Sequence, residues 1–255
     1  MKEPVVMIGV GEMGGVFARG ILRTGHPVIP VTRDMDMQIV AEKYPDPLLA
    51  LVAVAEKDLH PVLEKLPAAW HGCLGLLQNE LLPRDWQRYN YVNPTVISVW
   101  FEKKKGLDHK VLIPSPAFGP HAEFLVDALA MLDIPARTLL SAEELLDELV
   151  IKNVYILTTN ICGLVTKGSV EDLWSNHQEL AREVANEIID IQEWLTNNKF
   201  DREKLIQGMV EGIHGDPAHI CMGRSAPARL ARALQKADEA GLAVPRMHAI
   251  SANNP

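Results

Sequence analysis

The sequence predicts an α/β first part followed by an all-helical second part, and two patterns in the chain predict this class. From residue 4 to about residue 140, short apolar runs alternate with helical stretches, as in a parallel sheet flanked by helices. Beyond residue 141, apolar residues recur at helical spacing almost throughout. We therefore expect a first domain over residues 1–141 and a helical domain over residues 142–255.

Seven apolar runs predict strands, at residues 5–9, 28–32, 48–54, 72–78, 95–100, 111–114 and 136–140. Helices are predicted between them at 13–24, 37–44, 58–65 and 121–132. Lys103 to Lys105 with Gly106 predict a solvated hairpin tip. Ser141 and Glu144 have the spacing of a capping box, so a long helix is expected from Ser141 to Leu164. Helical spacing continues over 171–195, 201–213 and 228–240.

Composition excludes several classes of protein. Hydrophobic residues make up 47% of the chain and charged residues 23%, as in ordinary globular domains. The net charge of −8 argues against a nucleic-acid partner. The longest uninterrupted apolar run, Leu48 to Ala55, is far shorter than the ~20 residues that cross a bilayer, so no membrane-spanning segment is expected. The first residues do not resemble a secretory leader, which makes a cytoplasmic location the default expectation.

No metal site is expected from the sequence. Cys73, Cys162 and Cys221 stand singly in apolar surroundings without a CxxC pair, so we expect buried, reduced thiols. The histidines show neither HExxH nor paired-carboxylate spacing.

A G-x-G-x-x-G motif follows the first predicted strand and precedes the first predicted helix. In a dinucleotide-binding Rossmann domain, Gly9 would make the tight turn, Gly11 would let a pyrophosphate approach, and Gly14 would let helix and strand pack closely. The alternative is a glycine-rich turn without a ligand. The predicted cofactor contacts of this loop are Gly9, Val10, Gly11, Glu12, Met13 and Gly14.

The end of the second predicted strand indicates which cofactor binds. Arg33 stands where NAD-specific domains carry a carboxylate for the ribose 2′-hydroxyl, and an arginine there accommodates a 2′-phosphate. Arg33 therefore favours NADP. In the alternative interpretation, Asp34 binds the ribose and Arg33 is a solvated surface charge.

Lys152 and Asn160 lie eight residues apart on the long apolar helix of the second part. At this spacing they are offset by only ~80° around the helix and ~12 Å along it, so both can face one elongated cleft. The alternative is a surface lysine with a solvated head group.

With these residues in view, the sequence resembles the ketopantoate reductase family over most of its length. The matching segments are 8–14, Arg33, 77–79, 117–120, 152–160, 171–174 and 241–245. The resemblance implies that a hydride from NADPH reduces the ketone of a 2-oxo acid. It also implies that Lys152 protonates the nascent alkoxide, and that Asn79 and Asn160 help to order cofactor and substrate. An ammonium group suits that role, because it can stabilise the oxyanion that forms when a ketone accepts hydride and can then donate its proton. Burial in a cleft would lower the pKa of Lys152 toward working pH.

The segments that would hold the substrate depart from the family pattern. Ile156 stands where the family has a second asparagine, and Ile161 where it has proline. Ser225 stands near the position of a substrate-binding glutamate, and His219 near that of a serine for the substrate carboxylate. A lysine of the family after the third strand aligns on Ala55.

We therefore expect an NADPH-dependent reductase of a 2-oxo acid or related carbonyl other than ketopantoate, with Lys152 as general acid. The substrate-binding residues would be Asn160, His219 and Ser225. Two alternatives stay open, a non-catalytic NADP-binding protein of the same fold and another dehydrogenase of this architecture. The expected partner is a small-molecule oxo acid, and a homodimer stays open.

Overall fold

The structure is a computed structural model in which residues 2–253 are described. It divides into two compact units, Met1–Glu148 and Leu149–Pro255. The division falls inside helix α6 (Ala142–Thr166), whereas the boundary expected from the sequence falls at the start of that helix. The class is the expected one, α/β followed by helices.

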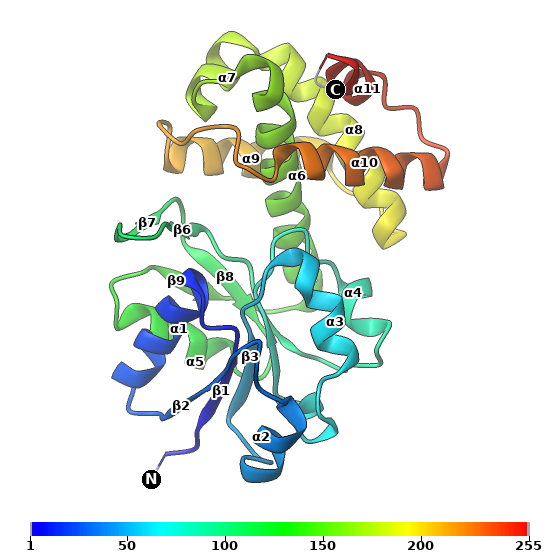
Figure 1. Ribbon diagram of the computed structural model, residues 1–255. Coiled ribbons are helices and arrows are strands. Elements are labelled where there is room, and N and C mark those ends of the chain that lie inside the picture. Colours follow the sequence, from blue (N-terminus) through cyan, green and yellow to red (C-terminus); the bar gives the residue numbers. More distant parts are fainter. Residues whose placement is uncertain (1, 254–255) are drawn as a thin grey trace. The chain divides into compact units, whose positions relative to one another are not determined.

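The first unit contains a seven-stranded sheet in the order β2-β1-β3-β4-β5-β8-β9. Helices cover both of its faces, with α1 and α5 on one side and α3 and α4 on the other (Figure 1). Because β–α–β crossovers are right-handed, connections that run in opposite directions along the sheet place their helices on opposite faces. The strands are β1 (Val5–Ile8), β2 (Val28–Val31), β3 (Leu49–Val52), β4 (Leu74–Leu76), β5 (Thr95–Ile97), β8 (Ser115–Phe118) and β9 (Ala136–Thr138). The helices are α1 (Glu12–Arg23), α2 (Met37–Lys43), α3 (Leu59–Glu64), α4 (Pro83–Gln87) and α5 (Ala122–Ala130), with 3₁₀ turns η1 (Glu56–Asp58) and η2 (Ala68–Cys73).

Apolar runs of the sequence form the central strands of the sheet. β1 pairs in parallel with β2 and β3, with Val5 opposite both Val28 and Leu49. Every residue of β1 and β3 is buried, because helices cover both faces of a parallel sheet. Phe17 of α1 and Leu125 of α5 complete the core on one face.

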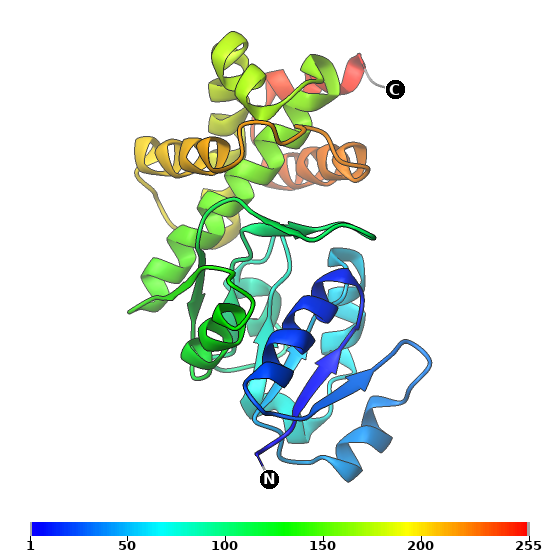
Figure 2. The ribbon, with the colours of Figure 1, turned by 90° about the vertical axis from the view of Figure 1, so that its left-hand side faces the viewer.

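The far edge of the sheet differs from the expected parallel arrangement. The chain leaves β5 through a hairpin of β6 (Phe101–Lys103) and β7 (His109–Val111), with Gly106 at a φ of +79° (Figure 2). It returns as β8, which is therefore antiparallel to β5. The strand predicted at 111–114 is wrong, since these residues end β7 and lead to β8. Because no helix separates β5 from β8, a parallel crossover cannot form.

The second unit is helical, as expected. Its helices are α6, α7 (Val170–Asn176), α8 (Gln178–Thr196), α9 (Arg202–Gly215), α10 (Ala226–Ala240) and α11 (Pro245–Ala252). Ser141 Oγ accepts the Glu144 N–H at 3.1 Å, which is the expected N-cap of α6. The helix predicted over 171–195 is broken at His177 into α7 and α8. No apolar residue between Trp174 and Leu180 continues the buried stripe across this break.

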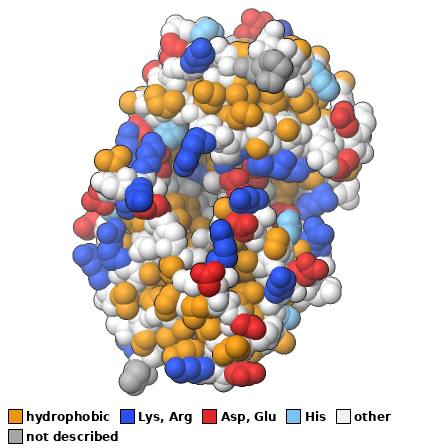
Figure 3. Space-filling view, viewed as in Figure 1, with side chains coloured by type: hydrophobic (Ala, Val, Ile, Leu, Met, Phe, Trp, Pro, Cys, Tyr) orange, Lys and Arg blue, Asp and Glu red, His pale blue; other side chains and the backbone are white. Residues whose placement is uncertain are grey.

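By length and composition alone, helix α6 is long and apolar enough to cross a membrane. The sequence analysis did not find this, because it considered only uninterrupted apolar runs and polar residues interrupt those of α6. Burial explains this composition, since 72% of its most apolar window is buried inside the structure. In both ribbon views, α9 and α10 run across α6 (Figures 1 and 2). On the surface in Figure 3, basic and acidic side chains are intermixed on each unit.

Candidate functional site

The sheet order changes direction between β1 and β3, because β2 lies on one side of β1 and β3 on the other. Doubly wound sheets bind ligands at the carboxyl ends of the strands at such a point. The glycine loop follows β1 directly, and Ala53 follows β3. The topology therefore places the predicted nucleotide loop at the switch point of the sheet.

Two glycines of the loop are required by close packing. Gly9 has a φ of +93°, and a Cβ there would lie 2.8 Å from Ala53 O. A Cβ on Gly14 would lie 2.1 Å from Gly9 O. Neither position can carry a side chain without moving backbone, so these glycines hold the start of α1 close to the ends of β1 and β3.

Gly11 is different, because a Cβ there would meet no heavy atom within 4 Å. Gly11 is the N-cap of α1. Because glycine has no side chain, the N-cap residue makes no side-chain hydrogen bond to the first N–H groups of the helix. An open backbone at a helix N-terminus suits an anionic diphosphate. The loop therefore fits the pyrophosphate of a dinucleotide.

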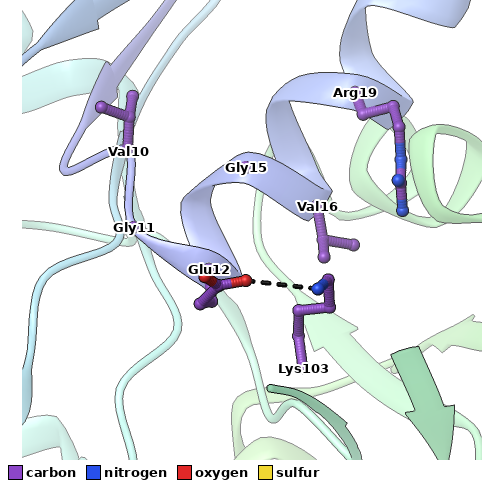
Figure 4. A pocket seen from close by; sticks show the side chains of 7 residues that line it. All are labelled: Val10, Gly11, Glu12, Gly15, Val16, Arg19 and Lys103. Carbon is purple, nitrogen blue, oxygen red and sulfur yellow. Dashed lines mark ion pairs between the residues drawn. The ribbon is translucent and has the colours of Figure 1, made fainter. Parts of the chain in front are cut away.

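A pocket of about 240 Å³ lies beside this helix start (Figure 4). Glu12 on α1 and Lys103 on β6 form an ion pair of 3.2 Å across it. The Lys103 side chain is only 15% exposed, so this lysine is not the solvated tip residue that the sequence predicted. Arg19, from the second turn of α1, lines the same pocket. Its lining residues are Val10, Gly11, Glu12, Gly15, Val16, Arg19 and Lys103.

Arg33 and Asp34 both lie on the surface after β2. The Arg33 side chain is 90% exposed, with Asp58 Oδ2 at 3.9 Å from its Nη2. Asp34 is also exposed. The guanidinium is therefore accessible to a ligand in the position where the sequence argument places a 2′-phosphate.

The loops after β3 and β4 are tied together by a residue that sequence analysis did not single out. Gln78 is buried, and its Nε2 donates to Val52 O at 2.8 Å and to Val54 O at 3.4 Å. Asn79 follows directly and is half-buried. Gln78 thus fixes the backbone that presents Asn79 at the carboxyl edge of the sheet. A polar residue directly after a buried strand was the available sequence signal.

Lys152 lies in the first half of α6 and is 9% exposed. Its ammonium stands over the Tyr155 ring, 5.9 Å from the ring centroid. Burial and, to a smaller extent, the positive charge of Arg229 lower the pKa of Lys152 to about 7. A lysine with this pKa can both hold and release a proton near neutral pH.

Asn160, two turns further along α6, contacts an arginine that the sequence analysis missed. Arg229 Nη1 donates to Asn160 Oδ1 at 3.0 Å, and both side chains are buried. The segment before α10 approaches α6 closely, since a Cβ on Gly163 would lie 2.7 Å from Cys221 Cβ. Asn160 and Arg229 are therefore brought together within the second unit, while Lys152 lies two turns earlier on the same helix. Ile156 lies between Lys152 and Asn160 at four-residue spacing and keeps that helix face apolar.

His219 and Ser225 precede α10. His219 Nδ1 lies 3.6 Å from Asp216 Oδ2, and His219 O accepts the Val170 N–H at 2.8 Å. These contacts connect His219 to the end of α9 and the start of α7. Ser225 is half-buried, and its carbonyl accepts the Arg229 N–H at 2.9 Å.

No family model matches the chain, and no curated protein matches it in sequence. Solved structures match over nearly the whole length. The 2-dehydropantoate 2-reductase from Methylococcus capsulatus matches with a TM-score of 0.70 and 13% identity, over 98% of this chain and 94% of that one. The dimeric ketopantoate reductase from Staphylococcus aureus matches with a TM-score of 0.69 and 16% identity, over 98% and 96%. The chain has the fold of the ketopantoate reductases.

The ketopantoate reductase fold also serves a second activity among the similar structures. A D-mandelate dehydrogenase, described as a complex with NADH, matches with a TM-score of 0.67 and 13% identity, over 98% of this chain and 97% of that one. The resemblance found in the sequence is thus confirmed as a likeness of fold. Fold alone does not select a substrate, which depends on the side chains of the site.

Proposed function

We propose that this protein is an NADPH-dependent reductase of a 2-oxo acid or related carbonyl, with Lys152 as the general acid. The single observation that carries the proposal is a buried lysine on α6 whose pKa is lowered to about 7, eight residues before Asn160. Perturbed pKa values of buried groups concentrate at functional sites. In the alternative, a non-catalytic NADP-binding protein, Lys152 would be a remnant without use.

The proposed cofactor contacts lie in the first unit. The loop from Gly9 to Gly14 and the start of α1 would hold the diphosphate, and Arg33 would bind the 2′-phosphate of NADP. Asn79 would help to order the cofactor. The open space at Gly11 and the exposure of Arg33 support this assignment. NADH in the similar D-mandelate dehydrogenase supports a nicotinamide cofactor in general.

The proposed chemistry assigns the proton to Lys152. When bound, a reduced nicotinamide would supply the hydride that the carbonyl carbon of the substrate accepts. The electron pair of the C=O bond then moves to oxygen, where the Lys152 ammonium stabilises the charge and donates a proton to give the hydroxy acid. The neutral amine regains its proton from solvent, which a pKa of about 7 permits at working pH.

The proposed substrate is an oxo acid with less hydroxylation than ketopantoate. Ile156 places an apolar side chain midway between Lys152 and Asn160, where the resembled family has an asparagine. A buried substrate hydroxyl left without a partner costs about 1 to 3 kcal/mol. Asn160, His219 and Ser225 are the proposed substrate contacts, and a homodimer is proposed by analogy with the dimeric enzyme of this fold.

The proposal is tested by following the oxidation of NADPH and of NADH with a panel of 2-oxo acids. The panel includes ketopantoate, phenylglyoxylate and branched aliphatic oxo acids. We expect turnover with NADPH, and a higher kcat/KM for an apolar member than for ketopantoate. Binding of NADPH without turnover of any member would support the non-catalytic alternative. Preference for ketopantoate would refute the assigned role of Ile156.

A further inference from the structure

The hairpin of β6 and β7 is fixed on helix α1 by an aromatic contact. The ring centroids of Phe101, on β6, and Phe17, on α1, lie 6.1 Å apart. Both side chains belong to the buried core of the first unit. Residues two apart on a strand share a face, so Lys103 lies on the same face of β6 as Phe101 and is directed toward α1.

The ammonium of Lys103 is held in place by three contacts. Its Nζ donates to Lys104 O at 2.9 Å and to Leu107 O, two carbonyls of the hairpin's own turn. The third contact is Glu12 Oε2, at 3.2 Å, on the first residue of α1. An ammonium group has three N–H donors, so two of them fix the charge to the turn and the third is directed at the start of α1. A cation fixed in this way loses little conformational freedom when it binds an anion.

The contact with Glu12 is the one that a ligand can replace. The Glu12 side chain is 46% exposed, and exposed ion pairs contribute little to stability because water solvates both charges well. The carboxylate can therefore turn to solvent at small cost, while the ammonium stays tied to the turn. A diphosphate carries two negative charges against the single charge of the carboxylate, so it attracts the ammonium more strongly.

The space between Lys103 and the helix is kept open by glycine. Gly11 and Gly15 line the pocket of about 240 Å³ on the side of α1, and Lys103 lines it from the hairpin (Figure 4). Outside its own helix and chain neighbours, a Cβ on Gly15 would meet no heavy atom of the described chain within 4 Å. Glycine destabilises a helix relative to alanine, and neither packing nor a left-handed backbone requires it here. What Gly15 provides is an open pocket over the first turn of α1.

The charges that line this pocket favour an anion. They are the carboxylate of Glu12 and the two cations of Arg19 and Lys103, so the lining is net positive. An anion bound at the glycine loop would be repelled by Glu12, which directly follows Gly11, unless a cation compensates that carboxylate. Lys103 compensates it from 3.2 Å.

We propose that Lys103 is a cofactor-binding residue that contacts the diphosphate of the dinucleotide in place of Glu12, so that the β6–β7 hairpin completes the nucleotide site. The inference rests on the proposed binding of a dinucleotide and not on the reduction of a carbonyl. Gly11 leaves room for the diphosphate on the side of α1, and Lys103 binds it from the side of the hairpin.

The test separates the diphosphate from the 2′-phosphate. ADP-ribose carries a diphosphate without a 2′-phosphate, and 2′-AMP carries a 2′-phosphate without a diphosphate. Both are titrated calorimetrically into the full-length protein, as is NADPH. Lys103→Met should raise the Kd of ADP-ribose and of NADPH about 10-fold, the scale of one charge-assisted contact, and leave that of 2′-AMP unchanged. Arg33→Ala should show the reverse pattern for ADP-ribose and 2′-AMP.

Lys105→Met is the matched control, because Lys105 is exposed in the same turn and is not among the residues that line the pocket. It should leave all three ligands unaffected. Because Lys103 also holds the turn, a second variant, Gly15→Leu, tests the pocket from the side of α1. Its Cβ meets no neighbouring atom, so the variant should fold, fill the pocket and weaken the binding of ADP-ribose but not of 2′-AMP.

Equal affinity of the parent and Lys103→Met proteins for ADP-ribose would overturn the proposal, as would equal weakening of ADP-ribose and 2′-AMP. If Lys103→Met fails to fold, Gly15→Leu decides, and its binding of ADP-ribose at the parental affinity would overturn the proposal. A parent protein that binds neither ADP-ribose nor NADPH would refute the proposed cofactor together with this inference. Weaker binding of ADP-ribose to Lys103→Met, without turnover of any oxo acid by the parent, would refute the proposed reductase and support the role of Lys103.

Discussion

Replacing Lys152 by Met is predicted to stabilise the protein, most strongly at or below neutral pH. In the unfolded chain this lysine titrates with its ordinary pKa of 10.5, and in the folded protein burial lowers the pKa to about 7. The folded state therefore holds the ammonium at a penalty on the order of 5 kcal/mol. Met fills similar volume without a charge, so we expect a gain on the order of 2 to 5 kcal/mol at pH 6.

The sign of the pH dependence follows from the lowered pKa. Below pH 7 both states carry the proton, and the penalty is fully present. Between pH 7 and 10.5 the unfolded chain binds the proton and the folded protein does not, so the parent protein gains stability as pH rises. The advantage of the Met variant should therefore shrink by about 2 to 3 kcal/mol between pH 7 and pH 9.

The assay is equilibrium unfolding in urea, followed by circular dichroism at pH 6, 7 and 9. Lys43→Met is the matched control, since Lys43 is exposed at the end of α2 and its replacement should give no such trend. The reasoning fails if Lys152→Met is less stable than the parent at pH 6, or if the difference between them does not change with pH.

Two further changes, each with its own measurement, test the proposed cofactor contacts and the glycine loop. Arg33→Ala should raise the Kd of NADPH about 10- to 100-fold, the scale of one charge-assisted hydrogen bond, with NADH affinity almost unchanged in fluorescence titrations. Equal weakening of both cofactors would show that Arg33 does not bind the 2′-phosphate. Gly14→Ala should lower the free energy of unfolding by several kcal/mol, because its Cβ would lie 2.1 Å from Gly9 O. Gly11→Ala, which meets no atom, is its control and should weaken dinucleotide binding with little loss of stability.

The local sequence predicted the sheet centre and the glycine loop because both depend on short-range pattern. A buried parallel strand is an apolar run, and the spacing of Gly9, Gly11 and Gly14 reflects one strand–turn–helix unit. The far edge was harder to predict, since Ser115–Phe118 contains Pro116 and shows no alternation of apolar and polar residues. Its place in the sheet depends on pairing with β5, which the local sequence does not contain.

The candidate site was predictable only where a motif or resemblance marked it. Arg229 lies in a helix segment rich in alanine and arginine, which is typical of a solvated face. In the structure it is buried and donates to Asn160, 69 residues earlier in the chain. Arg232, one turn later on the same helix, is less buried although its local sequence is similar. Sequence spacing gives no means of distinguishing the two arginines.

The pH dependence of kcat/KM for oxo-acid reduction, compared between the parent and Lys152→Met, tests the central claim most directly. Only the ammonium can donate a proton, so kcat/KM of the parent should fall about tenfold per pH unit above a pKa of about 7. The Met variant should bind NADPH normally, lose about 100-fold or more in kcat, and show no such fall. Full kcat in the Met variant, or the same fall above pH 7 in both proteins, would contradict the assignment of Lys152 as the general acid.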